Sequence, residues 1–403
     1  MALLRDPNPT STAVLPRREA LLPAPRTRES ASVLVLSCNH GGGHRSAAHA
    51  LREWWARHRP GWEVTVHDYL ARFVHPIYAR ISEISYVQSV RLVPSVYGFF
   101  YGLTANLANE SRLQVLINQL GKLPLYHYLQ RHPVDLIVCV HHTPAGALSE
   151  LKRDGRVTCP VATVVTDLVV HSQWIHPHID LYLVGSDTVR EGLIERGIPP
   201  DRIRITGIPI AERYASGVDV EAARRALRVR PDLPGVLVMV GAAGMVRKAI
   251  EVYHAMSDLP VEMYFVCGRD RRLRRRLETL TADIPHFHIL GYVDNVPELM
   301  AACDLTVTKA GGLTISEALA MELPMLIYRP IPGQEYANRD YLLRAGAAVY
   351  ARTRRELREQ LIELIRSPAR LEAMRAAARA IRRPHAAAAA AAAMSALVEG
   401  SER

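Results

Sequence analysis

The sequence predicts an α/β protein of two doubly wound, Rossmann-like domains that face each other across a central cleft. Its 403 residues are enough for two domains, each with its own core. Short apolar runs rich in β-branched residues alternate with amphipathic helical segments through both halves. Polar residues follow these runs, as they do at the carboxyl ends of parallel strands, where such sheets bind ligands.

The first domain is expected over residues 31–210 and the second over residues 211–375, with a linker at about 211–234. The strands expected in the first domain are SVLVLSC, VTVHDYL, VDLIVCVHHTP, VATVVTDL, IDLYLVGS and RIRITGIPI. Those expected in the second are GVLVMVGAAGM, EMYFVCG, FHILGYV, LTVTK and PMLIYR. The chain is expected to be helical from residue 351, and its Ala-rich end, 376–403, predicts a helix because alanine has the highest helix propensity.

The ends and the composition favour a cytoplasmic protein. Residues 1–30 are rich in Pro, Arg and Ser and are expected to form a disordered arm. They lack the compact apolar core and cleavage site of a secretory signal, and no apolar stretch is long enough to predict a spanning helix. The 5 cysteines are scattered and odd in number, which favours buried free thiols in a reducing compartment.

The formal net charge of +10 favours anionic partners such as nucleic acid, anionic lipid or phosphorylated substrates. The run RDRRLRRR, residues 269–276, is better explained as a solvated helix face than as a specific binding patch. Neither an aromatic platform nor a known nucleic-acid-binding module accompanies it, so we expect no nucleic-acid partner.

Residues 309–335, KAGGLTISEALAMELPMLIYRPIPGQE, carry the strongest functional signal. Gly311 and Gly312 form a turn that opens a helix, and the unpaired N–H groups of a helix start suit a phosphate. Thr314 and Glu317 are expected in the first turn of this helix, where a carboxylate can accept hydrogen bonds from two ribose hydroxyls.

An apolar strand and a Pro-rich turn follow this helix. The turn ends in Gln334, Glu335 and Asn338, which can all bind sugar hydroxyls. Phosphate, ribose and sugar sites thus follow one another along a single strand–loop–helix–strand unit, which predicts a nucleotide-sugar site. The alternative is an ordinary capped unit with a hydrophilic loop.

A second glycine turn, NHGGGHRS at residues 39–46, follows the first strand and opens another helix. Its three glycines let the backbone approach a ligand. His44 lies at the start of the helix, whose positive end disfavours imidazolium, so that a neutral His44 can act as a base. The alternatives are a turn histidine without catalytic function and a second phosphate loop, although the spacing is not GxGxxG.

The run TKAGGLTISEALAMELPMLIYRPIPGQEYAN resembles the donor-site motif of the monogalactosyldiacylglycerol synthases and processive diacylglycerol glucosyltransferases of glycosyltransferase family 28, to which the MurG-type enzymes also belong. The resemblance covers residues 31–350. It implies a GT-B fold, a UDP-sugar donor and a C-terminal helix that crosses back to the first domain. The family's similar GGGHR segment carries the general base, a role that the resemblance gives to His44.

Three further segments gain roles from this resemblance. The run TDL…H..W.HP at 166–177 implies an acceptor-side wall, in which Trp174 offers an apolar face and Asp167 anchors a hydroxyl or orients His44. The turns at 241–245 and 291–295 imply contacts to the diphosphate and to uracil. In relatives, the region equivalent to the aromatic and basic segment 75–130 helps to seat the lipid, and this composition by itself suits a membrane interface.

The candidate site residues divide by expected role. The catalytic candidates are His44 and Asp167. The donor-binding candidates are Gly43, Gly244, Met245, Arg247, Val293, Lys309, Gly311, Gly312, Thr314, Glu317, Gln334, Glu335 and Asn338. The acceptor-binding candidates are Pro94, Tyr97, His171, Trp174 and His176.

These expectations describe an inverting enzyme that moves a hexose from UDP-hexose to a diacylglycerol-like lipid. It would work at the inner face of the cell membrane as a peripheral protein on an anionic surface. We expect no metal, because no DxD-like pair follows a strand in the donor half, and no cofactor, since the UDP-sugar is a co-substrate. The alternatives are a MurG-like N-acetylglucosaminyl transferase on a polyprenyl-linked acceptor, a UDP-sugar epimerase, and a non-enzymatic nucleotide-sugar sensor.

Overall fold

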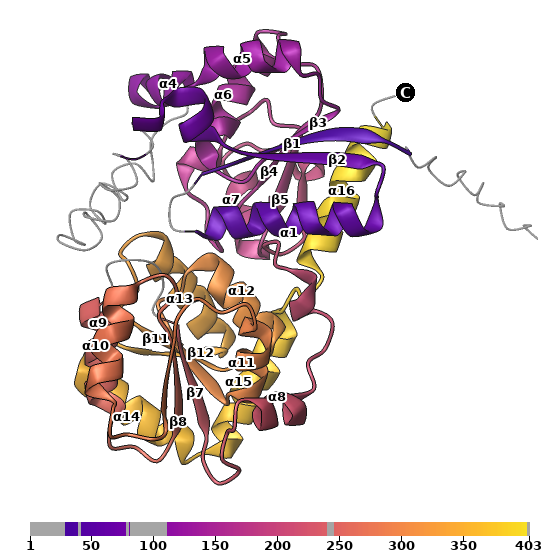
Figure 1. Cartoon of the computed structure of the whole chain (residues 1–403). Helices are drawn as coiled ribbons and strands as arrows, with labels where there is room; N and C mark the ends of the chain where they lie inside the picture. The colour runs from indigo at the N-terminus through magenta and orange to yellow at the C-terminus, as the bar shows by residue number, and fades with distance from the viewer. Residues whose placement is uncertain (1–28, 39–41, 78–79, 81–110, 240–245, 401–403) are drawn as a thin grey trace, which may run out of the picture.

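The computed structural model describes residues 29–38, 42–77, 80, 111–239 and 246–400, apart from the side chains of residues 112, 113, 246 and 247. Its strands form two six-stranded parallel sheets, each flanked by helices (Figure 1). The predicted fold class, two Rossmann-like domains in the GT-B arrangement, is therefore confirmed.

The first sheet has the strand order β2-β1-β3-β4-β5-β6. Its strands are β1 (Ala31–Ser37), β2 (Trp62–Asp68), β3 (Leu136–Cys139), β4 (Val161–Val164), β5 (Leu181–Val184) and β6 (Ile203–Ile205). The second sheet has the order β12-β11-β10-β7-β8-β9. Its strands are β7 (Gly235–Met239), β8 (Glu262–Val266), β9 (Phe287–Leu290), β10 (Leu305–Thr308), β11 (Met325–Tyr328) and β12 (Ala348–Ala351).

The helices follow the alternation that the sequence predicts. They are α1 (Gly43–His58), α4 (Arg112–Gln119), α5 (Lys122–Arg131), α6 (His142–Arg153), α7 (Asp187–Ile194), α8 (Val220–Ala226), α9 (Val246–Met256), α10 (Arg271–Leu280), α11 (Val296–Ala302), α12 (Gly312–Ala320), α13 (Gln334–Ala345), α14 (Arg354–Ile365), α15 (Pro368–Ile381) and α16 (Ala386–Gly400). Shorter helical turns are η1 (Leu70–Val74), η2 (Ser172–Trp174), η3 (Pro200–Arg202) and η4 (Glu212–Tyr214).

Strand order places the ligand-binding loops. The direction of winding reverses between β1 and β3 in the first sheet and between β7 and β10 in the second. Loops at such switch points form a crevice at the carboxyl ends of the strands. The glycine turn before α1 and the turn before α12 both lie at these points, so the two motifs that the sequence singled out belong to one cleft.

The Ala-rich helix α16 packs against the first sheet's domain although it follows the second in the chain (Figure 1). Ala390, Ala391 and Met394 share a buried cluster with Ala47 and Leu51 of α1. Because alanine side chains are short, α16 can lie close to α1. The chain therefore passes between the two domains twice, once before α8 and once after α15.

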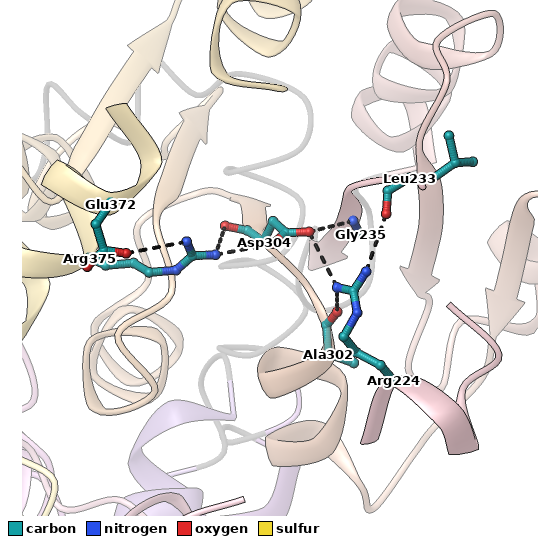
Figure 2. A network of polar contacts seen from close by, with 7 residues as sticks. All are labelled: Arg224, Leu233, Gly235, Ala302, Asp304, Glu372 and Arg375. Carbon is teal, nitrogen blue, oxygen red and sulfur yellow. Dashed lines mark hydrogen bonds and ion pairs between the residues drawn. The ribbon is translucent and has the colours of Figure 1, made fainter. Parts of the chain in front are cut away.

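Asp304, just before β10, anchors the flanks of both crossings to the second sheet (Figure 2). Its carboxylate accepts a hydrogen bond from Gly235 N at 2.9 Å. Arg224 of α8 lies 3.5 Å from one carboxylate oxygen and Arg375 of α15 lies 3.2 Å from the other. Arg224 also donates to the carbonyl oxygen of Ala302 at 2.9 Å. These contacts fix the helices beside both crossings, so we expect movement between the domains to occur in the connecting segments themselves.

The described residues contain neither a helix that could span a membrane nor a disulfide. No helix in that part of the chain is long and apolar enough to cross a bilayer. All five cysteines are free thiols, of which only Cys159 is not fully buried, as the sequence predicted.

Candidate active site

His44 lies in the first turn of α1 and is held by the first domain. Its Nδ1 lies 2.8 Å from the carbonyl oxygen of Val140 and 3.0 Å from Oγ1 of Thr166. A carbonyl oxygen only accepts hydrogen bonds, so Nδ1 must carry the proton. In the neutral ring, Nε2 is then the basic nitrogen. The structure therefore gives His44 the tautomer that a general base needs.

Two histidines that the sequence analysis did not select surround this ring. The ring of His141 lies edge-on to that of His44 with 4.9 Å between centroids, and the ring of His142 lies 4.1 Å from that of His141. Nδ1 of His141 accepts a hydrogen bond from Thr143 N at 3.2 Å and so caps α6. A neutral His141 therefore carries its proton on Nε2. The pair was missed because VHH at the end of a strand has no distinctive spacing.

Asp167 lies beside the cleft and contacts the second domain. Its carboxylate accepts hydrogen bonds from the side chains of Asn338 and Trp174. Its pKa is raised to about 7, first by burial and then by the nearby Glu335 carboxylate, against the lowering effect of these hydrogen bonds and of Lys309. Val140 and Thr166, not Asp167, hold His44 Nδ1. The hydrogen bond from Asn338 to Asp167 instead joins the two domains.

Asn338 forms the other side of this interdomain contact. Its Oδ1 accepts a hydrogen bond from Leu168 N at 2.9 Å, and its Nδ2 donates to the carbonyl oxygen of Ala310 at 3.1 Å. The side chain is fully buried. We expected Asn338 to bind sugar hydroxyls, but here both ends of its amide are engaged with protein. Its position predicts that it holds the loops before α12 and after β4 together.

The glycine turn before α12 brings the domains into close contact. A Cβ atom at Gly312 would lie 2.2 Å from the carbonyl oxygen of Thr166, so only glycine fits there. At Gly311 the nearest atom to an added Cβ would be Nζ of Lys309, at 3.3 Å. Gly43, at the start of α1, faces Leu313 of α12 across the cleft. Thr314 is half-buried in the first turn of α12.

Lys309 and Glu335 form an ion pair behind this turn. Glu335 is 4% exposed, and its second oxygen accepts a hydrogen bond from Ile331 N at 2.7 Å. Gln334 is the first residue of α13 and is half-buried. Lys248, which the sequence analysis did not select, donates to the carbonyl oxygen of Arg329 at 2.9 Å. Burial lowers the pKa of Lys248 to about 8.

A cleft of about 620 Å³ opens between α1 and the second domain. Glu317 of α12 lines this cleft and accepts a hydrogen bond from Tyr214. Burial raises the pKa of Glu317 to about 7, while Tyr214 and the charge of Arg213 lower it. Val293 is half-buried, between the exposed Tyr292 and Asp294 of the cleft wall. The sequence analysis missed Tyr214, because nothing in the linker signals a site.

The wall of this cleft on the first domain comes from α1. Arg45 and His49 line it, one residue and five residues after His44. The candidate base, His44, and the ribose-binding candidate, Glu317, thus belong to neighbouring parts of one interdomain space.

The three described acceptor candidates are buried. Trp174 is 2% exposed, and its ring centroid lies 6.4 Å from that of His44. Trp174 therefore packs beside His44 rather than presenting the open apolar face that we expected. His171 is 5% exposed and caps η2 through Nδ1. His176 is 3% exposed, and burial lowers its pKa to about 4, which keeps the ring neutral.

The remaining candidates are Gly244, Met245, Pro94 and Tyr97, which lie outside the described residues, and Arg247, whose side chain does. In the part of the chain that the structure covers, no three His, Cys, Asp or Glu side chains gather as a metal site.

Comparison with known proteins identifies similar sequences across both domains. The family model described as monogalactosyldiacylglycerol (MGDG) synthase matches residues 44–210, and the model described as glycosyl transferases group 1 matches residues 222–381. A processive diacylglycerol beta-glucosyltransferase of Bacillus cereus (strain AH187) is 30% identical over 357 residues, which cover 88% of this chain and 91% of that protein.

A second relative, the processive diacylglycerol beta-glucosyltransferase of Bacillus licheniformis, is 29% identical over 346 residues, which cover 85% of this chain and 89% of that protein. Among solved structures, MurG of Acinetobacter baumannii is similar with a TM-score of 0.60 at 17% identity, covering 90% of this chain and 99% of the other. That likeness is one of fold.

Proposed function

The chain belongs to the family of the processive diacylglycerol beta-glucosyltransferases, and from this membership we propose that it is an inverting glycosyltransferase. It moves a hexose from a UDP-sugar to a hydroxyl group of diacylglycerol or a related lipid. The acceptor binds to residues 31–210 and the donor to residues 211–375. The match of two different family models to residues 44–210 and 222–381 supports this division.

The tautomer of His44 is the observation that carries the mechanism. Val140 O and Thr166 hold Nδ1–H, so the basic Nε2 takes the proton of the lipid hydroxyl. The hydroxyl oxygen attacks the anomeric carbon as the bond from that carbon to the diphosphate oxygen breaks. A single displacement with one base inverts the anomeric configuration, and UDP leaves with the bonding electrons.

The charge of the departing UDP is stabilised by the second domain. The start of α12 has no side-chain cap, and Leu313 of its first turn lines the cleft, so the helix dipole favours an anion there. Lys309 and Lys248 supply positive charge behind this turn, and Glu317 binds the ribose. No step of this route requires a metal ion or a cofactor.

A panel of UDP-sugars incubated with diacylglycerol, with products identified by mass spectrometry, tests the proposal. We expect a hexosyl-diacylglycerol from at least one UDP-hexose. A glycosylated polyprenyl diphosphate in a parallel reaction would support the MurG-like alternative instead. Interconversion of UDP-sugars without acceptor would support an epimerase. MurG and a UDP-N-acetylglucosamine 2-epimerase resemble the chain at 17% and 14% identity, which concerns the fold alone.

We further propose that the enzyme works as a peripheral protein on the inner face of the cell membrane, through the segment 75–130. Leu116 and Leu123 are 64% and 56% exposed on α4 and α5, and Ile77 is 63% exposed. Large exposed apolar side chains of this kind favour a membrane or protein contact. The exposed Arg80 and the net charge of +10 favour anionic lipid over neutral lipid.

A further inference from the structure

The segment Glu212–Tyr214 connects the two domains and contacts both of them. It forms η4, between β6 and α8, and all three of its side chains line the 620 Å³ cleft. Each side chain has a different partner. Three consecutive residues of a connector thus contact the donor side of the cleft and the helix that carries His44.

Glu212 contacts the first domain. Its two carboxylate oxygens lie 2.6 Å from Nη1 of Arg57 and 2.7 Å from Nε2 of His58, both in the last turn of α1. The Glu212 side chain is 27% exposed, so this double contact is partly shielded from solvent. His44, Arg57 and His58 all lie on α1. By binding the last turn of this helix, Glu212 ties the connector to the helix that orients His44.

Arg213 and Tyr214 contact the second domain. Arg213 donates to the carbonyl oxygen of Asp294 at 2.5 Å, in the loop that carries Val293. Tyr214 is 5% exposed and donates its hydroxyl hydrogen bond to the carboxylate of Glu317. The connector thus holds both of the elements that we assign to the nucleoside, the base-binding loop and the ribose-binding carboxylate.

Resting on the proposed function, we propose that Glu212, Arg213 and Tyr214 act as one positioning segment for the donor nucleoside. Tyr214 keeps Glu317 ionised and oriented toward the ribose, and Glu212 transmits that arrangement to α1. The chemistry supports this role, since an ionised carboxylate offers both oxygens as acceptors to vicinal hydroxyls, whereas protonation turns one of them into a donor. Burial alone would favour the protonated acid, and the Tyr214 hydroxyl opposes burial by stabilising the anion.

Other charged groups face Glu317 from the elements around it. Arg45, His49, Glu53 and Arg57 of α1 line the same cleft, as do Arg269 and Asp294 of the second domain. The pKa of His49 is lowered, first by burial and then by neighbouring arginines, so His49 loses its charge at a lower pH than Glu317 gains its own. Helix α15 packs on α12 as well, but its Arg379 pairs with Glu322 instead.

The experiment measures UDP-glucose affinity by calorimetry from pH 5.5 to pH 9 for the wild type, Tyr214→Phe and Glu317→Gln. UDP-glucose is the probe because, unlike UDP, it has no terminal phosphate that titrates in this range. We expect wild-type affinity to rise through about pH 7, in step with the ionisation of Glu317. The Glu317→Gln variant should bind more weakly, with no such rise.

The Tyr214→Phe variant should shift this rise to higher pH by about one unit, since one unit corresponds to a modest hydrogen bond. Its affinity would then be about fivefold lower than wild type at pH 7 and equal to wild type at pH 9. The matched control is Tyr253→Phe, which loses a hydroxyl of α9 that donates to the carbonyl oxygen of Leu280 in α10 at 2.9 Å; neither residue lines the cleft. It should leave the profile unchanged.

The contact to the first domain is tested with Glu212→Gln. If the segment acts as a unit, the double variant Glu212→Gln, Tyr214→Phe should lose less affinity than the product of the fold losses of the two single variants. A Tyr214→Phe variant with weaker binding but an unshifted pH profile would show that Tyr214 only packs, and would overturn the inference. If the wild type bound neither UDP-glucose nor UDP at any pH, the proposed function itself would fail.

Discussion

Replacement of Asn338 by leucine should slow transfer from every UDP-sugar by the same factor. The leucine is also branched at Cγ but cannot accept the hydrogen bond from Leu168 N, 2.9 Å long in the wild type, or donate to the Asp167 carboxylate. Across the cleft the variant loses one hydrogen bond to a neutral group, about 0.5–1.5 kcal/mol, and one to a charged group, about 1.5–3 kcal/mol. The closed arrangement of the domains therefore loses about 2–4.5 kcal/mol.

If transfer requires this arrangement, the lower bound corresponds to a loss of about 30-fold in kcat/KM. The assay compares kcat/KM for the variant and the wild type with several UDP-hexoses at one pH, together with UDP affinity. A loss that depended on the sugar would restore Asn338 to the donor site, as the sequence suggested. A rate within about threefold of wild type would refute the interdomain role. The control is Gln360→Leu, which removes a side-chain amide that donates to Glu363 of the same helix, α14, at 3.5 Å.

Three further changes test other parts of the site. Asp167→Asn should raise the melting temperature at pH 8 while lowering transfer. Burial raises the pKa of Asp167 from 3.8 to about 7. The contribution of this carboxyl group to stability is therefore present below pH 3.8 and is lost as the pH rises through about 7. A variant that melts below wild type at both pH 5 and pH 8 would contradict this. Glu335→Gln weakens the contact to Lys309 and should change the preference among UDP-hexoses while sparing UDP affinity, which product ratios in mixed-donor assays measure. Binding to anionic vesicles should fall with salt, and Arg80→Glu with Arg91→Glu should weaken it, since each basic side chain near an anionic surface adds about 1 kcal/mol; equal binding to neutral vesicles would exclude the electrostatic part.

Strand positions were predictable because the sheets are parallel and buried on both faces. Apolar runs such as Leu136–Cys139 are fully buried, so they appear in the sequence as continuous hydrophobic stretches without alternating polar residues. The missed strand was β12, Ala348–Ala351, at the edge of the second sheet. It is only 4 residues long, two of them half-buried, and an Arg-rich helix follows it. A short edge strand of this kind carries little hydrophobic pattern.

The two glycine turns were predictable as sites because their residue chemistry is local. The contacts between distant segments were not. The sequence predicted that Asn338 binds the sugar, yet its side chain accepts a hydrogen bond from Leu168, which lies 170 positions away in the sequence. In the sequence, Tyr214 is one residue of the linker, and only the fold shows that it contacts Glu317. Such roles depend on which loops meet across the cleft, and no spacing within the sequence encodes that.

The rate of lipid glycosylation by His44→Ala, measured beside its UDP affinity, tests the central claim most directly. Val140 O holds Nδ1–H of His44 at 2.8 Å, which leaves Nε2 as the base for the lipid hydroxyl. Loss of a general base typically costs about 10²–10⁴-fold in rate. The account predicts a loss of that size in hexosyl-diacylglycerol formation with UDP affinity nearly unchanged. A variant that kept more than about a third of the wild-type rate would show that His44 is not the base.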